Sequence, residues 1–196
     1  MSSGLRISAL ALLLVCIPLC EHRGMFPEKI FFGEMPAPEI TAATGPISPY
    51  DDLLKKYADT LGWDWRLLAA VIYRESRFHS TAQSPKGAVG LMQIRSERYT
   101  EEELLDPETN LMIGTRYLKR LEAMFPGASP VEGIKFTLAA YNLGEGKVGR
   151  LIERAGAEGI DNTRWDSVAA LLPKGHHTVC YVNNVLATFD EYSKGR

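Results

Sequence analysis

The strongest constraint on the fold is the helical spacing of apolar residues around Glu75. Leu68, Val71, Ile72 and Phe78 recur at steps of three and four residues, which is the spacing of one buried face of an α-helix. Glu75 falls in the middle of this stripe, where an apolar residue is expected. Alternating β-branched runs, which are typical of strands, are absent. The sequence therefore predicts a mainly α domain.

Start and stop signals divide this domain into six to eight helices. The first is predicted to begin near Pro49 and end at Gly62, and Asp64 is placed to cap the second, which carries Glu75. Asp106 is placed to cap a third that runs up to Pro126. Further helical elements are expected over residues 129–142, 148–156, 163–173 and 177–192, and a loop over residues 79–90.

The chain has three predicted regions. Residues 1–20 hold one cation, Arg6, followed by an apolar run too short to span a membrane comfortably, which predicts an export signal. Residues 21–47 contain four prolines and no sustained periodicity, which predicts a flexible tether to the domain at residues 48–196. Without the signal, 21 Lys and Arg face 24 Asp and Glu, a net charge of −3, so no basic field indicates a nucleic-acid partner.

The cysteines bear on the fate of the signal. Cys20 follows apolar residues, as in bacterial lipoprotein signals whose cysteine is acylated, whereas Leu19 is larger than the residue usual before such a cysteine. Lipid anchoring through Cys20 and simple cleavage both stay open. Cys180 is the one cysteine in the domain, which excludes an internal disulfide, and no Cys/His cluster has metal-ligand spacing, so we expect no metal.

Glu75 has two interpretations. Most glutamates beside an apolar stripe bend outward at its rim. However, Glu75 lies near the C-terminal end of its helix and among apolar residues, and both conditions should raise its pKa. A carboxyl group that stays protonated near neutral pH can act as a general acid. The loop that follows adds a hydroxyl at Ser84, an amide at Gln93, and glycines that allow a ligand to approach the backbone.

Four ordered segments resemble the lytic transglycosylases of the soluble-lytic-transglycosylase type. These segments are "ESRF" continued by "AQSPKGAVGLMQI" (75–94), "DPETNLMIGTRYLKRL" (106–121), "AAYNLGEGKV" (139–148) and "TVCYVNNV" (178–185). The resemblance covers essentially everything after the tether. It implies a lysozyme-like catalytic domain, of the type shared by goose-type lysozyme and this family, over residues 48–196.

The resemblance also implies site residues. Glu75 matches the single catalytic acid/base of the family. Six further positions match residues that hold or face the substrate: Ser84, Met92, Gln93, Tyr141, Asn142 and Tyr181. Among them, Tyr181 matches the tyrosine whose hydroxyl faces the catalytic carboxylate. No cofactor is implied.

The activity implied is cleavage of the β-1,4 bond between N-acetylmuramic acid and N-acetylglucosamine in peptidoglycan, with a 1,6-anhydro product. The expected partner is therefore a peptidoglycan glycan strand, and the expected location is the periplasm, at the outer membrane if Cys20 is acylated. Two alternatives stay open. One is a lysozyme-like muramidase that uses water, and the other is a peptidoglycan-binding protein with weak or no turnover.

The sequence departs from the family pattern at two positions. His177 stands where the closing motif normally has a glutamate, which leaves open a hydrogen-bonding role, contact with another part of the glycan, or weakened catalysis. Glu145 stands where proline is common, and we expect it to be exposed in a turn that is less stiff.

Overall fold

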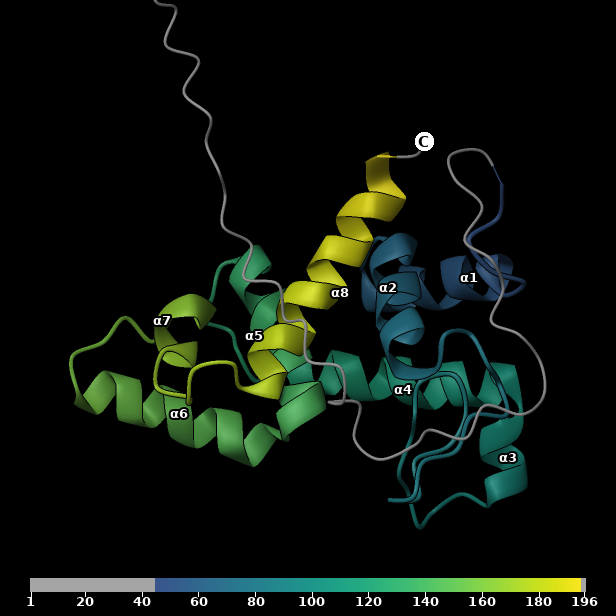
Figure 1. Ribbon diagram of the computed structural model, residues 1–196, viewed down its shortest axis with the longest axis horizontal. Helices are drawn as coiled ribbons and strands as arrows, with labels where there is room; N and C mark the ends of the chain where they lie inside the picture. Colours follow the sequence, from purple (N-terminus) through teal and green to yellow (C-terminus); the bar gives the residue numbers. More distant parts are fainter. Residues whose placement is uncertain (1–44, 195–196) are drawn as a thin grey trace, which may run out of the picture.

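The protein is described here by a computed structural model that covers residues 45–194 (Figure 1). This part of the chain contains eight α-helices and no strand, which confirms the predicted mainly α fold. In chain order the helices are α1 (Asp51–Leu61), α2 (Trp65–Ser76), α3 (Glu101–Leu105), α4 (Pro107–Glu122), α5 (Pro130–Leu143), α6 (Glu145–Ala157), α7 (Trp165–Ala169) and α8 (His177–Lys194).

Two central helices bring distant parts of the chain together. In Figure 1, α8 runs diagonally through the middle of the molecule, with α2 beside it, and these two helices are in direct contact. Helix α5 contacts α4, α6 and α8, while α1 contacts α2 and α4. Helices α6 and α7 lie together on the side opposite α1 (Figure 1). None of the helices within residues 45–194 is both long and apolar enough to cross a membrane.

The predicted apolar stripe of α2 forms the centre of the core. Leu68, Val71 and Ile72 are fully buried, and Phe78 is nearly so. Removing such side chains from water is the largest favourable contribution to folding, roughly 1.5–3 kcal/mol for each. Glu75 is only partly exposed within this apolar surface.

The predicted helix caps are confirmed. The side chains of Asp64 and Asp106 accept hydrogen bonds from backbone N–H groups in the first turns of α2 and α4, and Ser129 does the same for α5. Gly62 ends α1 in the left-handed conformation, with φ of 82°. These contacts satisfy N–H groups that have no partner within the helix.

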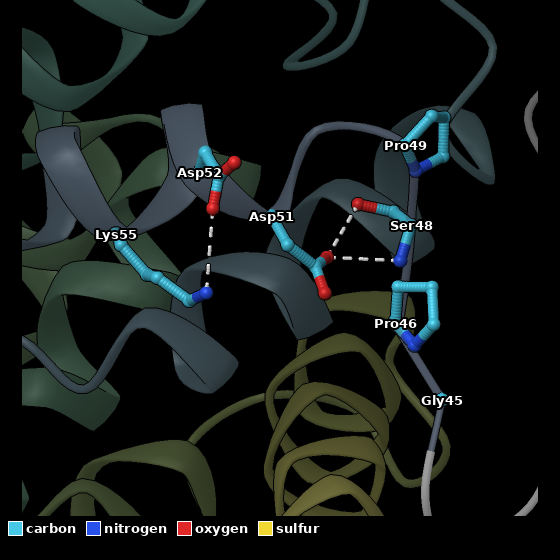
Figure 2. Close-up of a pocket in the computed structure, with 7 residues that line it drawn as sticks. All are labelled: Gly45, Pro46, Ser48, Pro49, Asp51, Asp52 and Lys55. Carbon is cyan, nitrogen blue, oxygen red and sulfur yellow. Dashed lines mark hydrogen bonds and ion pairs between the residues drawn. The ribbon is translucent and has the colours of Figure 1, made fainter.

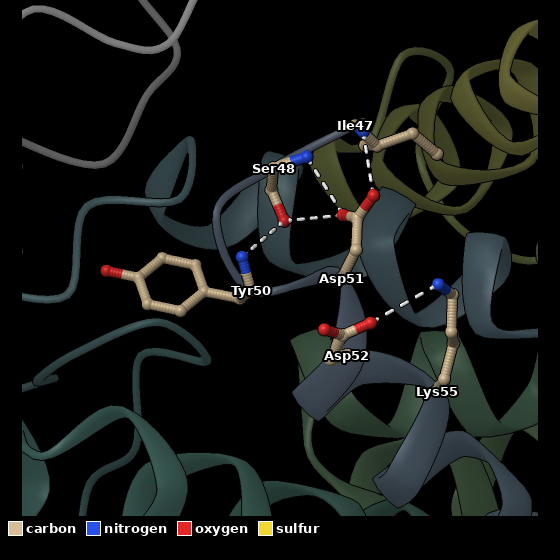
Figure 3. Close-up of polar contacts among 6 residues, drawn as sticks. All are labelled: Ile47, Ser48, Tyr50, Asp51, Asp52 and Lys55. Carbon is tan, nitrogen blue, oxygen red and sulfur yellow. Dashed lines mark hydrogen bonds and ion pairs between the residues drawn. The ribbon is translucent and has the colours of Figure 1, made fainter. Parts of the chain in front are cut away.

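The entry into α1 differs from the prediction. Pro49 precedes the helix, which begins at Asp51. The Asp51 carboxylate reaches back and accepts the N–H groups of Ile47 and Ser48, each at 2.9 Å (Figure 3). Ile47 is also buried in the core. The compact part of the chain therefore includes the last residue of the predicted tether.

One short helix and the first residues of another were not predicted from the sequence. Helix α3 is a single short element held by a capping box, in which Thr100 and Glu103 bond to each other's backbone N–H. Helix α6 begins at Glu145, three residues before the predicted start. The glycines around Glu145 suggested a turn, but only Gly144 has the positive φ of a turn residue.

The chain reverses direction directly after α2. Arg77 and Phe78 have positive φ values of 51° and 63°, a conformation that costs a non-glycine residue of order 1–3 kcal/mol. Burial of Phe78 and its ring contact with Tyr73, at 6.0 Å between centroids, offset this cost. The predicted loop follows, and it carries isolated antiparallel bridges that link Val89 to Gln83 and to Ile94.

Asn110 of α4 fixes this loop to the helical core. Its side chain is fully buried, accepts the N–H of Met92 at 2.8 Å, and donates to the carbonyls of Val89 and Leu104 at 2.9 and 2.7 Å. Gly90 allows this close approach, because a Cβ there would lie 2.2 Å from Asn110 Nδ2 and 2.4 Å from the Leu104 carbonyl oxygen. The loop is therefore packed as tightly as the core.

We predict that Gly90→Ala destabilises the protein by at least about 2 kcal/mol more than Gly87→Ala, as measured by urea unfolding. The two glycines are matched, since both lie in this loop with φ near +75° to +78°. Both substitutions incur the strain of a left-handed alanine. Only the one at position 90 adds a clash, because nothing lies within 4 Å of a Cβ at Gly87. Equal losses for the two variants would contradict the tight contact with Asn110.

Candidate functional site

Glu75 is bound by a tyrosine 106 residues later in the chain. The hydroxyl of Tyr181, on α8, donates to Glu75 Oε1 at 2.6 Å across the contact between α2 and α8. This bond occupies one carboxyl oxygen and leaves Oε2 as the oxygen that can carry and deliver a proton. The predicted pairing of these two residues is therefore present in the geometry.

Tyr141, on α5, completes a cluster with Glu75 and Tyr181. The charge of Glu75 raises the pKa of both tyrosines, and burial raises it more. The Tyr141 hydroxyl donates to the backbone carbonyl of Met92 at 2.6 Å, and its ring lies 5.5 Å from that of Tyr117. Three helices and the loop after α2 thus meet around one carboxyl group, and both tyrosines remain neutral hydrogen-bond donors.

The environment of Glu75 favours the protonated acid. Burial raises its pKa from 4.5 to about 7, against smaller opposing effects of the Tyr181 hydrogen bond and the charge of Arg74. The direction agrees with the expectation from sequence, and removal from water is the main cause. Near neutral pH, Glu75 is therefore present both as an acid and as a carboxylate.

Ser84 and Gln93 shape the loop beside Glu75. The Ser84 hydroxyl accepts the N–H of Ala88 at 3.0 Å. Gln93 has a positive φ of 48°, and its amide nitrogen donates to the carbonyls of Ala82 and Gly90, both at 3.1 Å. Both side chains are partly exposed, so they brace the loop and still present polar atoms at its surface.

The other two predicted site residues contribute in different ways. The side chain of Met92 is fully buried beside Gly114 in α4, so it does not line a groove, and its contribution is the carbonyl that receives Tyr141. Asn142 is exposed, and its Oδ1 accepts the hydroxyl of Thr178 at 2.8 Å. This bond ties the end of α5 to the start of α8.

Glu145 is held by α4, contrary to the expectation of an exposed residue in a looser turn. Its two carboxylate oxygens accept from Tyr117 and Arg120, each at 2.8 Å. These hydrogen bonds lower the pKa of Glu145, which therefore stays ionised. As the first residue of α6, this anion also lies at the favourable end of the helix dipole. Glu145 therefore fixes α6 and supports the ring contact between Tyr117 and Tyr141.

A surface hollow at the entry to α1 contains none of the predicted site residues. It is lined by seven residues (Figure 2): Gly45, Pro46, Ser48, Pro49, Asp51, Asp52 and Lys55. Its carboxylates already accept local hydrogen bonds or pair with Lys55, so it offers no reactive group. Across residues 45–194, no group of three or more His, Cys, Asp or Glu side chains is arranged to hold a metal.

Comparison with known proteins identifies the family of the domain that carries these residues. Residues 52–163 match the family model described as "Transglycosylase SLT domain". The chain belongs to this family.

Relatives of this SLT-family chain share its fold. The membrane-bound lytic murein transglycosylase F of Desulfosudis oleivorans is 36% identical over 160 residues, covering 70% of this chain and 35% of the relative. The soluble lytic transglycosylase SLT70 of Escherichia coli has a TM-score of 0.64 at 30% identity, over 76% of this chain and 24% of SLT70. An inactive Glu-to-Gln mutant of the lytic transglycosylase Slt of Pseudomonas aeruginosa has a TM-score of 0.58 at 26% identity, over 74% and 24% of the two chains.

These matches confirm the lysozyme-like, mainly α fold of the SLT family. They also define a difference in size, because the chain spans about a third of the curated relative and about a quarter of the solved enzymes. The shared region holds Glu75, the loop after α2 and Tyr141.

Asn110 and Thr178 support the SLT site and were not singled out from the sequence. Asn110 anchors the backbone of Met92, which in turn receives Tyr141. Thr178 is fully buried and binds Asn142. One signal was available for Asn110, since it directly precedes the inward-facing Leu111 and lies one turn before Gly114. A polar side chain at such a position needs buried partners.

We predict that the carboxyl carbon resonance of Glu75, followed by NMR, titrates with a midpoint near pH 7. Tyr181→Phe should move this midpoint higher, because the lost hydrogen bond is one of the interactions that lower the Glu75 pKa. Glu145 is the internal control, and it should titrate below its ordinary value of 4.5 in both proteins. A Glu75 midpoint near 4.5, or a downward shift in the variant, would contradict burial as the main cause.

Proposed function

We propose that this chain is a peptidoglycan lytic transglycosylase, which cleaves the β-1,4 bond between N-acetylmuramic acid and N-acetylglucosamine and leaves a 1,6-anhydro end. The observation that carries the proposal is the half-buried Glu75, with a pKa of about 7 and one oxygen held by Tyr181. Three relatives bear the name lytic transglycosylase, and a Glu-to-Gln mutant of one of them is described as inactive.

In the proposed reaction, Glu75 acts first as an acid and then as a base. Its proton passes to the glycosidic oxygen as the bond from this oxygen to C1 of muramic acid breaks, and C1 acquires oxocarbenium character. The Glu75 carboxylate then takes the proton of the muramic acid 6-hydroxyl while O6 bonds to C1. Glu75 ends protonated as it began, and no water is consumed.

A single carboxyl group suffices for this scheme, whereas most glycoside hydrolases use two. Two other carboxylates of the domain have structural roles. Glu145 is bound through both oxygens to α4, and Asp106 caps α4. The pKa of each is lowered by these hydrogen bonds. They are therefore ionised, and neither is poised to donate a proton near neutral pH.

The remaining site residues position the substrate and the acid in this proposal. Tyr181 fixes the orientation of Glu75, and Tyr141 and Asn142 lie at the end of α5, where α5 meets α8. Ser84 and Gln93 present polar atoms from the braced loop. General acid-base help is worth roughly 10²- to 10⁴-fold, so oriented binding by these groups must supply most of the remaining acceleration.

We further propose that the chain acts on glycan strands in the periplasm after export. The predicted signal, the tether up to residue 44 and Cys20 lie outside the described residues. Acylation of Cys20 would hold the protein at a membrane, and the proposal is tested by labelling with a palmitate analogue. Loss of label in Cys20→Ser is expected if the anchor exists, whereas an unlabelled wild-type protein would mean release after cleavage.

We predict that peptidoglycan sacculi digested by the wild-type protein yield anhydro-muropeptides, which mass spectrometry separates from hydrolysed products by the mass of one water. Glu75→Gln should fold normally and lose at least about 10²-fold in rate, because an amide of nearly the same shape has no proton to deliver. Reducing-end products would instead indicate a muramidase. Retention of a large fraction of the rate in the variant would remove Glu75 from the mechanism.

The pH dependence should follow the protonation of Glu75. Since the acid form is required, we expect kcat/KM to be level at acidic pH, to reach half its maximum near pH 7, and to fall about tenfold for each further pH unit. Turnover of soluble glycan strands measures this. A profile that rises through pH 7 would show that the ionised form is the one required.

A further inference from the structure

The start of α8 carries His177 where the family pattern has a glutamate. His177 lies four residues before Tyr181, so both side chains project from the same face of α8, one turn apart. Because Tyr181 binds Glu75, His177 lies along the face of α8 that leads to the candidate acid. Its side chain is exposed, and its ring lies 4.3 Å from that of His176.

Positive charges from two other segments act on His177. The pKa of His177 is lowered by its partial burial and by the charges of His176, Lys147 and Lys86, so each of these charges lies within electrostatic reach of His177. Lys147 is in the first turn of α6, just beyond Asn142, whose Oδ1 accepts from Thr178 next to His177. Lys86 and Lys147 are both exposed.

The turn that carries Lys86 is built into the loop after Glu75. The Ser84 hydroxyl and backbone both bond to Ala88, and the Gly87 N–H donates to the Ser84 carbonyl at 2.9 Å. Lys86 is thus held at the tip of an ordered turn.

The two lysines, like Lys119 and Lys174, have no carboxylate partner in the described chain, whereas four other lysines do. Lys55, Lys56, Lys135 and Lys194 are each paired with a carboxylate. Lys86 and Lys147 form no ion pair with a carboxylate within residues 45–194. An exposed pair of cations with no local counter-ion, beside an imidazole that can donate a hydrogen bond, is suited to an anionic ligand.

We propose that Lys86, Lys147 and His177 form a subsite that selects substrates with a carboxylate next to the bond that is cleaved. This inference rests on the proposed function, because the glycan supplies the carboxylate. Two sources share this chemistry. One is the lactyl group of a muramic acid that has lost its peptide, and the other is a stem peptide attached to that lactyl group. A glutamate at position 177 would repel either carboxylate, and His177 removes this repulsion.

The test compares four tetrasaccharides of alternating N-acetylglucosamine and N-acetylmuramic acid: stem-free and stem-bearing forms, each with free carboxylates or with all carboxylates capped as amides. Binding to the full chain carrying Glu75→Gln is measured by calorimetry. We expect the free carboxylate to bind roughly 5- to 10-fold more tightly than its amide in at least one pair, and the pair that shows the preference identifies the source. Equal binding in both pairs would overturn the proposal.

Variants then assign the preference to these residues. Lys86→Gln with Lys147→Gln, and separately His177→Glu, should weaken binding of the free carboxylate by roughly 5- to 10-fold and leave binding of the amide within about twofold. His177→Gln should retain most of the preference. Weakened binding of both ligands alike would mean general disruption of the groove and would count against the proposal.

A matched control removes two cations elsewhere. Lys55→Gln with Lys194→Gln carries the same charge change, and Lys194 lies at the opposite end of α8, about 25 Å from His177. This variant should keep the full preference for the free carboxylate over the amide. If it lost the preference, the effect of the Lys86 and Lys147 substitutions would be explained by net charge alone. The binding assay needs no turnover, so an inactive wild-type protein would refute the proposed reaction while the carboxylate preference could still be observed.

Discussion

The structure depends on the burial of one carboxyl group between α2 and α8. Glu75 occupies the centre of an apolar stripe, where an ionised group is costly, and its hydrogen bond to Tyr181 partly offsets that cost. The result is a pKa of about 7. A fully exposed glutamate would be ionised at neutral pH, and one with several strong donors would be held in the ionised form. The proposed acid needs a higher pKa than in either of these cases, and the packing of Glu75 against α8 provides it.

Much of the surrounding structure fixes the positions of the groups around Glu75. Asn110 joins the loop after α2 to α4, and the loop presents the Met92 carbonyl to Tyr141. Glu145 joins α6 to α4 through Tyr117 and Arg120, and Tyr117 contacts the ring of Tyr141. Each of these contacts places a polar group where its hydrogen bonds are satisfied, so hydrogen bonds hold the side of the site that faces the core. The exposed groups, Asn142, Lys86 and Lys147, lie on the side that a ligand can reach.

The two departures from the family pattern have different structural consequences. At Glu145, where the resemblance implies a stiff proline, two hydrogen bonds to α4 fix the position of α6. At His177, the change is electrostatic, because it leaves Lys86 and Lys147 beside an imidazole in place of an anion. The first departure preserves geometry. In our proposal, the second changes which charged groups the site can accept.

The sequence by itself determined most of the helices, their caps and the choice of Glu75, but neither α3 nor the start of α6. These depend on local rules: the spacing of apolar residues, the side chains of Asp64, Asp106 and Ser129, and the presence of a carboxyl group in an apolar stripe. The tertiary structure alone decided that Met92 turns its side chain into the core, that Asn110 braces the loop, and that Glu145 is bound. Periodicity within one helix carries no information about partners on another, and each of these outcomes depends on such a partner.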